Sequence, residues 1–135
     1  MNLAVADRRV RSVLVVDDDE IGSSVLRVML NDLGVTEVHV ASGGRDALRT
    51  LAELTYAPDL VICDLYMPDM DGIEFMAELA TQHYQGAVVL VSGVDVEMLS
   101  LAQDLVLADG IRLLGSFPKP LRADTLAAML KANNP

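Results

Sequence analysis

The chain has 135 residues, 52% of them hydrophobic, and its 10 basic residues against 20 acidic ones give a formal net charge of −10. This length fits one domain with a sizeable core, and the acidic excess argues against direct binding to nucleic acid phosphates. A single cysteine, Cys63, excludes an internal disulfide framework and a zinc site built from several cysteines. No apolar run approaches the about 18 residues of a membrane span, so the sequence predicts a cytoplasmic protein that does not engage membranes.

The first apolar run that predicts a strand begins at Val13. Residues 1–11 are therefore expected to form a flexible leader, with its arginines in a solvated basic stretch. One folded domain is expected over residues 12–131, followed by a short tail at 132–135. No linker, internal repeat or low-complexity tract interrupts this range.

Five short apolar runs predict strands. They are Val13–Val16, Glu37–Ala41, Leu60–Cys63, Ala87–Val91 and Ile111–Leu114. Most are apolar on both faces, which is typical of a parallel sheet covered by helices on both sides. The second run alternates between polar and apolar residues, so we expect it at an edge of the sheet.

Between these runs, apolar residues three and four positions apart predict amphipathic helices. In the first such segment the positions are Ile21, Val25, Val28 and Met29. The second helix is expected to start at Ser42-Gly43-Gly44, and Asp71-Gly72 is expected to form the turn before the third. Five strand–helix units in succession predict an α/β fold, a doubly wound parallel sheet of five strands with right-handed crossovers.

Polar residues follow four of the predicted strands. Asp17 and Asp18 follow the first strand, Asp64 the third and Ser92 the fourth, while Lys119 comes after the fifth. Ligands of such sheets bind beyond the carboxyl ends of the strands, so these side chains are expected to converge. Clustered carboxylates need a compensating cation, and oxygen ligands of this kind suit Mg²⁺ completed by a phosphate.

A carboxylate beside a metal can act as a nucleophile towards a phosphoryl group and form an aspartyl phosphate. Asp64 is the candidate for this role, and Ser92 is placed to hydrogen-bond the new phosphate. Lys119, fixed between two prolines, is suited to hold a phosphoryl oxygen and share its developing charge.

Four motifs in this order and spacing resemble the receiver domains of two-component response regulators, chemotaxis regulators included. They are VLVVDDDE, DLVICDLYMPDMDGIEF, VVLVSG and FPKPL, and the resemblance covers about residues 12 to 130. It implies a flavodoxin-like (βα)5 fold with strand order 2-1-3-4-5. It also implies that Asp64 is the phosphoacceptor and that Mg²⁺ binds the side chains of Asp18 and Asp64, the backbone carbonyl of Tyr66 and, mainly through water, Asp17.

The resemblance further implies phosphoryl-contacting roles for Ser92 and Lys119. In this family a sensor histidine kinase or a histidine phosphotransfer protein donates the phosphoryl group, and the receiver catalyses only its own phosphorylation and slow hydrolysis. The signal is expected to leave through the face made by the fourth helix, the fifth strand and the fifth helix, towards a downstream effector or a second copy.

The sequence departs from the family pattern in a switch region made of Gly93, Ser116 and Phe117. The aromatic residue usual three positions before the lysine is replaced by Ser116, with Phe117 next to it, and Gly93 stands where alanine is common. We therefore expect movement around Gly93 to dominate over a ring flip. Tyr66 and Val94 offer no group to orient an attacking water, which predicts slow autodephosphorylation. The segment ADGIRLLGSFPKPL also resembles receivers that precede EAL phosphodiesterase domains.

Two alternative functions stay open at this stage. A hydrolase of the haloacid dehalogenase type would use Asp17-Asp18-Asp19 as its D-x-D motif, but no acidic pair follows Lys119. An interaction module with a degenerate, non-phosphorylated site is the other alternative, although competent residues fill every expected position. A calcium loop around Asp69-x-Asp71 is excluded because its first ligand would have to be Met67.

Overall fold

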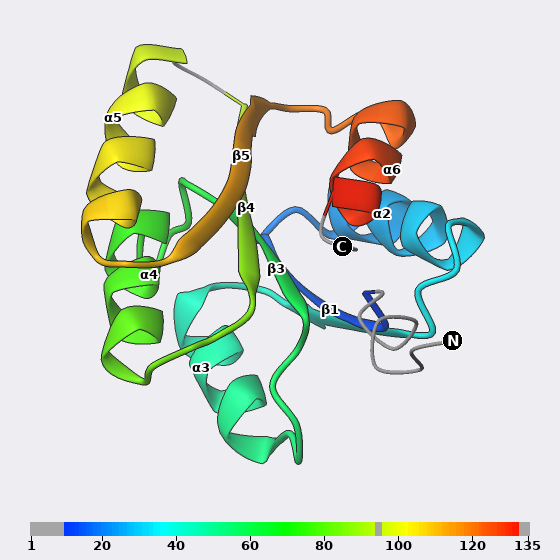
Figure 1. The fold of residues 1–135 in the computed structure, drawn as a ribbon, viewed down its shortest axis with the longest axis horizontal. Coiled ribbons are helices and arrows are strands. Elements are labelled where there is room, and N and C mark those ends of the chain that lie inside the picture. The colour runs from blue at the N-terminus through cyan, green and yellow to red at the C-terminus, as the bar shows by residue number, and fades with distance from the viewer. Residues whose placement is uncertain (1–9, 94–95, 133–135) are drawn as a thin grey trace, which may run out of the picture.

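The structure is a computed structural model that describes residues 10–93 and 96–132. Strands and helices alternate along the chain (Figure 1). Their order is β1 (Ser12–Val16), α2 (Glu20–Asp32), β2 (Glu37–Ala41), α3 (Gly44–Glu53), β3 (Leu60–Asp64), α4 (Gly72–Thr81), β4 (Ala87–Ser92), α5 (Val96–Ala108), β5 (Arg112–Pro118) and α6 (Ala123–Ala132).

The five strands form one parallel sheet in the order β2-β1-β3-β4-β5, which confirms the predicted fold class and strand order. Every residue of β3 and β4 is buried, whereas β2 at one edge is mostly exposed or half-buried, as its alternating sequence predicts. In the register, Val16 pairs with Cys63 and Asp64 with Val91. The carboxyl ends of the three central strands therefore lie together.

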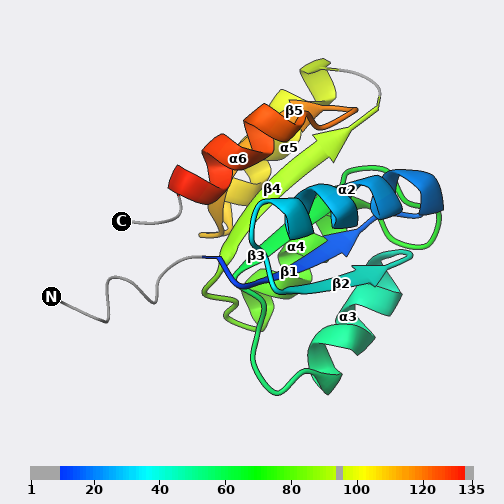
Figure 2. The ribbon, with the colours of Figure 1, turned by 90° about the vertical axis from the view of Figure 1, so that its right-hand side faces the viewer.

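Helices cover both faces of the sheet. Helices α3, α4 and α5 lie on one face and α2 and α6 on the other (Figures 1 and 2). The first face packs against Phe75, Met76 and Leu79 of α4, and the second against Leu26 of α2 and Leu126 of α6. Burial on both faces explains why the central strands are apolar throughout.

Helix α2 forms where predicted, but the apolar stripe named from the sequence is not the buried one. Ile21, Val25 and Val28 are exposed, Ile21 by 78%, while the buried positions are Ser23, Leu26 and Leu30. Of the predicted stripe, Met29 is partly buried and packs against the core. The helix carries apolar residues on two stripes, so spacing alone does not reveal which one packs on the sheet. The outward stripe leaves an apolar surface on α2.

Strand β5 is longer than predicted. The predicted run ends at Leu114, whereas the strand continues to Pro118 and so includes Ser116 and Phe117. Val88 pairs with Leu113 and the next residue, Val89, with Gly115, so Leu114 is the extra residue of a bulge. Gly115-Ser116 resembles a turn in sequence, but here the glycine belongs to the bulged strand.

The predicted leader and tail lie mostly outside the described residues, which leave out 1–9 and 133–135. Within the predicted leader, Val10 is buried in the core and the Arg11 N–H donates to the Asp59 carboxylate at 2.8 Å. Among the described helices, none is both long and apolar enough to cross a membrane.

Candidate functional site

Three carboxylates meet where β1 and β3 end. Asp17 and Asp64 are buried, with 4% and 5% of their surfaces exposed, and Asp18 is exposed beside them. One oxygen from each of the three lies within 4.8 Å of the others. The strand register brings about this meeting, since it aligns the last residues of neighbouring parallel strands.

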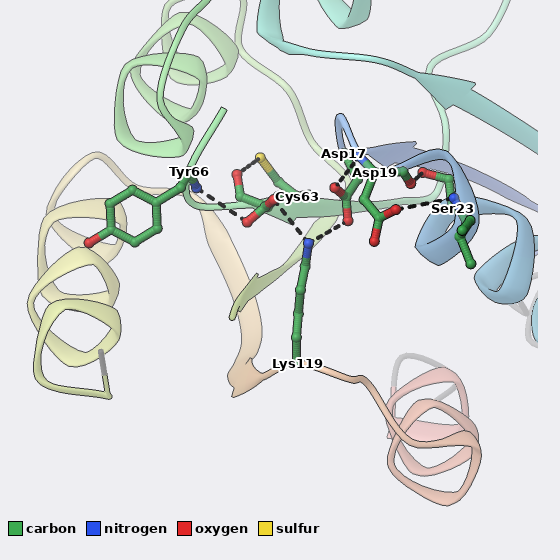
Figure 3. Close-up of polar contacts among 8 residues, drawn as sticks. Asp17, Asp19, Ser23, Cys63, Tyr66 and Lys119 are labelled. Atoms are coloured by element: carbon green, nitrogen blue, oxygen red, sulfur yellow. Dashed lines mark hydrogen bonds and ion pairs between the residues drawn. The ribbon is translucent and has the colours of Figure 1, made fainter. Parts of the chain in front are cut away.

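Lys119 reaches this cluster from the chain just after β5 (Figure 3). Its Nζ lies 2.7 Å from Asp17 Oδ2 and 3.0 Å from Asp64 Oδ2, so one ammonium group bridges two buried carboxylates. The backbone N–H of Lys119 donates to the Ser92 carbonyl at 2.7 Å. Lys119 thus joins the carboxyl ends of β1, β3 and β4 to the end of β5.

The second oxygen of each buried carboxylate accepts a backbone N–H. Asp17 Oδ1 accepts from Asp19 N at 2.9 Å, and Asp64 Oδ1 accepts from Tyr66 N at 3.2 Å. Asp19 in turn caps α2, because its carboxylate accepts the Ile21 N–H at 3.2 Å. Local loop backbone therefore fixes both carboxylates in place.

Burial and ion pairing act in opposite directions on the charges of the site. Burial raises the pKa of the Asp64 carboxyl, and the hydrogen bond from Lys119 offsets only part of that rise. For Lys119 burial lowers the pKa, but the hydrogen bonds to Asp17 and Asp64 outweigh it and leave the pKa raised. Lys119 is therefore a permanent cation at neutral pH. Burial also raises the pKa of the Cys63 thiol, which lies in the core.

Other predicted site residues surround the cluster. Ser92 is fully buried at the end of β4, one residue beyond the partner of Asp64. The Tyr66 ring points away from the carboxylates and is 43% exposed (Figure 3). A Cβ added to Gly93 would meet only Lys119 Cδ, at 3.8 Å, so no contact requires a glycine here. Val94 lies outside the described residues.

Ser116 and Phe117 are not part of the acidic cluster. They point to opposite faces of β5, as neighbours on a strand must. The Ser116 hydroxyl donates to Gln103 Oε1 of α5 at 2.6 Å. Phe117 packs towards α6 and lines an open pocket there with Asp124 and Met129, among others.

Sequence reasoning missed two residues that contact the predicted site elements. Gln103 is the partner of Ser116, and Asp69 binds the first N–H groups of α3 from the loop after β3. Gln103 lies outside the four motifs, and Asp69 lies within the second one, where the resemblance implies no role for it. The one available signal for Asp69 was the predicted helix start at Gly43-Gly44, which carries no capping side chain of its own.

The chain matches a family described as the response regulator receiver domain, over residues 13–131. It belongs to that family. A response regulator from Colwellia psychrerythraea is 30% identical, with a TM-score of 0.75 over 91% of this chain and 95% of that one. The chemotaxis protein CheY4 of Vibrio cholerae is 27% identical, also with a TM-score of 0.75, over 91% and 98% of the two chains.

Curated relatives match over part of their length. The Regulator of RpoS from Escherichia coli is 34% identical over 95 residues, which is 70% of this chain and 27% of that protein. A protein-glutamate methylesterase/protein-glutamine glutaminase from Myxococcus xanthus is 42% identical over 63% of this chain and 24% of that protein. The chain thus spans about a quarter of these relatives. It is a receiver domain of two-component signalling, and the haloacid dehalogenase alternative is set aside.

Proposed function

We propose that the domain, over residues 12–131, accepts a phosphoryl group on Asp64 from a phosphohistidine and responds by changing a binding surface. The observation that carries this proposal is the bridge from Lys119 Nζ to Asp17 and Asp64 at the edge where Ser92 ends β4. A nucleophile, a fixed cation and a hydroxyl donor are the groups that phosphoryl transfer to a carboxylate requires.

In the transfer step an Asp64 carboxylate oxygen attacks phosphorus. The O–P bond forms as the bond from phosphorus to the imidazole nitrogen breaks, and the electron pair of that bond stays on the imidazole. Lys119 faces Asp64 Oδ2 and compensates the charge of the phosphoryl oxygens, while Ser92 is the hydrogen-bond donor to one of them. Water later attacks phosphorus, the bond from phosphorus to the Asp64 oxygen breaks, and inorganic phosphate leaves the free carboxylate behind.

The donor set fits Mg²⁺, since it consists of carboxylate oxygens, two of them from buried residues. We assign the site to the side chains of Asp18 and Asp64 and the backbone carbonyl of Tyr66. Following the family resemblance, Asp17 would contribute mainly through water; its two oxygens accept from Asp19 and Lys119. The ion would neutralise phosphoryl charge.

The donor is a sensor histidine kinase or a histidine phosphotransfer protein of the cytoplasm. The exposed stripe of Ile21, Val25 and Val28 supports this, because it begins beside the acidic edge and offers apolar surface for a protein donor. Replacing Ile21 and Val25 by serine is expected to slow transfer from a phosphotransfer protein and to leave phosphorylation by acetyl phosphate unchanged. Equal slowing with both donors would contradict this docking surface.

Output is proposed through the face of α5, β5 and α6, towards an effector or a second copy. Leu101, Leu105 and Leu107 of α5 are exposed, and Ser116 ties that helix to the strand that leads to Lys119. A phosphate held by Ser92 and Lys119 adds charge at the end of this strand.

The deciding experiment is incubation with Mg²⁺ and acetyl phosphate, followed by intact mass. We expect the wild type to gain one phosphoryl group only when Mg²⁺ is present. Asp64→Asn removes the nucleophile and should gain none. Asp109→Asn is the matched control. This exposed carboxylate lies just before β5, at the amino ends of the strands and away from the site, so its replacement should leave the gain intact.

Failure of the wild type with acetyl phosphate calls for the same assay with a histidine phosphotransfer protein as donor. A gain there supports the proposal with a donor requirement. No gain from either donor would reject it in favour of an interaction module with a degenerate site.

A further inference from the structure

Helix α3 begins without a capping side chain of its own. Its N-cap residue is Gly43, whereas α2 and α4 are capped by the adjacent Asp19 and Asp71. The missing acceptor comes from the loop between β3 and α4. Asp69 Oδ1 accepts the Gly44 N–H at 3.3 Å and Asp69 Oδ2 the Arg45 N–H at 3.1 Å.

The two glycines allow this loop to approach so closely. A Cβ on Gly43 would lie 2.5 Å from Asp69 Oδ1, and one on Gly44 would lie 2.8 Å from Met70 Cβ. The backbone of Gly43 is extended, with φ of 178°, so its conformation alone does not demand glycine. Glycine is needed at both positions because the side chains of Asp69 and Met70 occupy the space that a Cβ would take.

The same loop carries the backbone of the acidic site. It starts at Leu65, directly after Asp64, and the Tyr66 N–H donates to Asp64 Oδ1. At its other end Asp71 caps α4 through the Glu74 N–H at 2.8 Å, and the Gly72 N–H donates to the Leu65 carbonyl at 2.8 Å. These contacts close the loop on itself and on α4. The hydrogen bonds of Asp69 instead join the loop to α3.

We propose that Asp69 is a positioning residue, which by capping α3 holds the loop so that the Tyr66 carbonyl is presented to a metal ion bound at Asp64. This inference rests on the proposed function. The N–H of Arg45 also keeps the pKa of Asp69 below its usual range, so the cap is a full negative charge at the positive end of a helix. Replacing a group that orients metal ligands in this indirect way commonly lowers metal affinity by about 10-fold to 100-fold.

The test separates two effects of Asp69: the link that it makes between the loop and α3, here called the tether, and the cap that it provides for α3. Asp69→Ala removes both, whereas the double variant Gly43→Asp/Asp69→Ala restores a cap from within α3, in the space that Asp69 vacates, but not the tether. Asp69→Asn keeps an acceptor oxygen and serves as the conservative variant. Asp46→Ala is the matched control, because it removes an acid from the first turn of α3 and contacts Ser42 and Arg49 rather than the loop.

Two measurements are made on each variant: Mg²⁺ affinity by calorimetry, and amide hydrogen exchange of Tyr66 and of α3 without metal. We expect Asp69→Ala to weaken Mg²⁺ binding about tenfold and to speed exchange at Tyr66. The double variant should recover protection in α3 but neither the Mg²⁺ affinity nor the protection of Tyr66. Asp69→Asn should retain most of the affinity, and Asp46→Ala should leave Tyr66 unchanged.

Full recovery of Mg²⁺ affinity in the double variant, or an unchanged Tyr66 in Asp69→Ala, would overturn the inference. Failure of the proposed function is distinguishable, because the wild type would then bind no Mg²⁺. Faster exchange at Tyr66 in Asp69→Ala and in the double variant, with none in Asp46→Ala, would still show that Asp69 holds the loop.

Discussion

The central strands and the edge strand β5 share one sheet but differ in how firmly they are held. All residues of β3 and β4 are buried and pair in an unbroken register. Strand β5 is half-buried over most of its length and carries a bulge opposite Val88 and Val89. Asp64, the proposed nucleophile, ends one of the fully buried strands, and Lys119 follows the less buried edge strand.

Under the proposed function, this difference would separate the phosphoryl-transfer site from the part that responds. A nucleophile gains from a fixed position, since misplacement weakens every contact made in the transition state. A switch needs an element with two arrangements of similar free energy, and few buried contacts make that attainable. Lys119 links the two regions, because it contacts Asp64 through its side chain and the Ser92 carbonyl through its backbone.

The most direct way to break this comparison is to truncate one aromatic ring in each region. Phe75 of α4 is fully buried against the central strands, and Phe117 of β5 is partly exposed. Phe75→Ala should lower the free energy of unfolding by about 3–5 kcal/mol because it leaves a closed cavity. Phe117→Ala should lower it by about 1–2 kcal/mol, since less apolar surface is lost from the interior.

Urea unfolding followed by circular dichroism measures both values, with an unchanged slope as the check on two-state behaviour. Equal losses for the two variants would show that β5 is as firmly packed as the centre and would remove the basis of the comparison.

Lys119→Met tests the link between the regions. We expect its effect on the activation free energy of phosphorylation to be similar to, or slightly smaller than, the effect of Phe75→Ala on the free energy of unfolding. It keeps the length of the side chain and removes the charge between Asp17 and Asp64. We expect phosphorylation by acetyl phosphate to slow by about 10²-fold to 10³-fold, as for other lost electrostatic donors. Mg²⁺ affinity should hold or rise, because the two carboxylates lose a competing cation. A parallel loss of Mg²⁺ binding and phosphorylation would assign Lys119 a merely structural role.

The site at the carboxyl ends of the strands could be predicted from sequence, because a parallel sheet brings these ends together. Asp17, Asp64 and Ser92 each end a short apolar run, and the ends of such runs meet at one edge in any sheet of this kind. No knowledge of side-chain packing was needed. The lysine between two prolines was placed by the same argument.

The remaining features depend on tertiary contacts that periodicity does not encode. The buried stripe of α2 was missed since the helix has two apolar stripes, and the end of β5 was missed since Gly115 resembles a turn. Gln103 and Asp69 are polar residues whose partners lie on other elements. Their roles follow only from the positions of Ser116 and of α3.

A double-mutant cycle on Ser116 and Gln103 sharpens the account of the edge region. Their hydrogen bond of 2.6 Å is part-buried, and it joins β5 to α5 on the face proposed for output. Ser116→Ala and Gln103→Ala should show a coupling of about 0.5–1.5 kcal/mol in the free energy of unfolding. The coupling should shrink when Asp64 carries a phosphoryl group, if this contact changes during the response. A coupling of the same size in both states would remove Ser116 from the switch.

The smallest effect expected is a pH dependence of the free energy of unfolding that arises from Asp69, in the loop after β3. Hydrogen bonds from the Arg45 and Gly44 N–H groups hold the pKa of Asp69 below its ordinary value of about 3.9. A group with a lowered folded-state pKa stabilises the fold above its unfolded pKa, and this stabilisation is lost as the pH falls through the folded value. The unfolding free energies of wild type and Asp69→Asn should therefore differ by a constant amount from about pH 5 to 7 and converge below about pH 4. Denaturant unfolding across this range measures the difference, and a gap that does not narrow on acidification would mean that the Asp69 carboxylate does not cap α3 in solution.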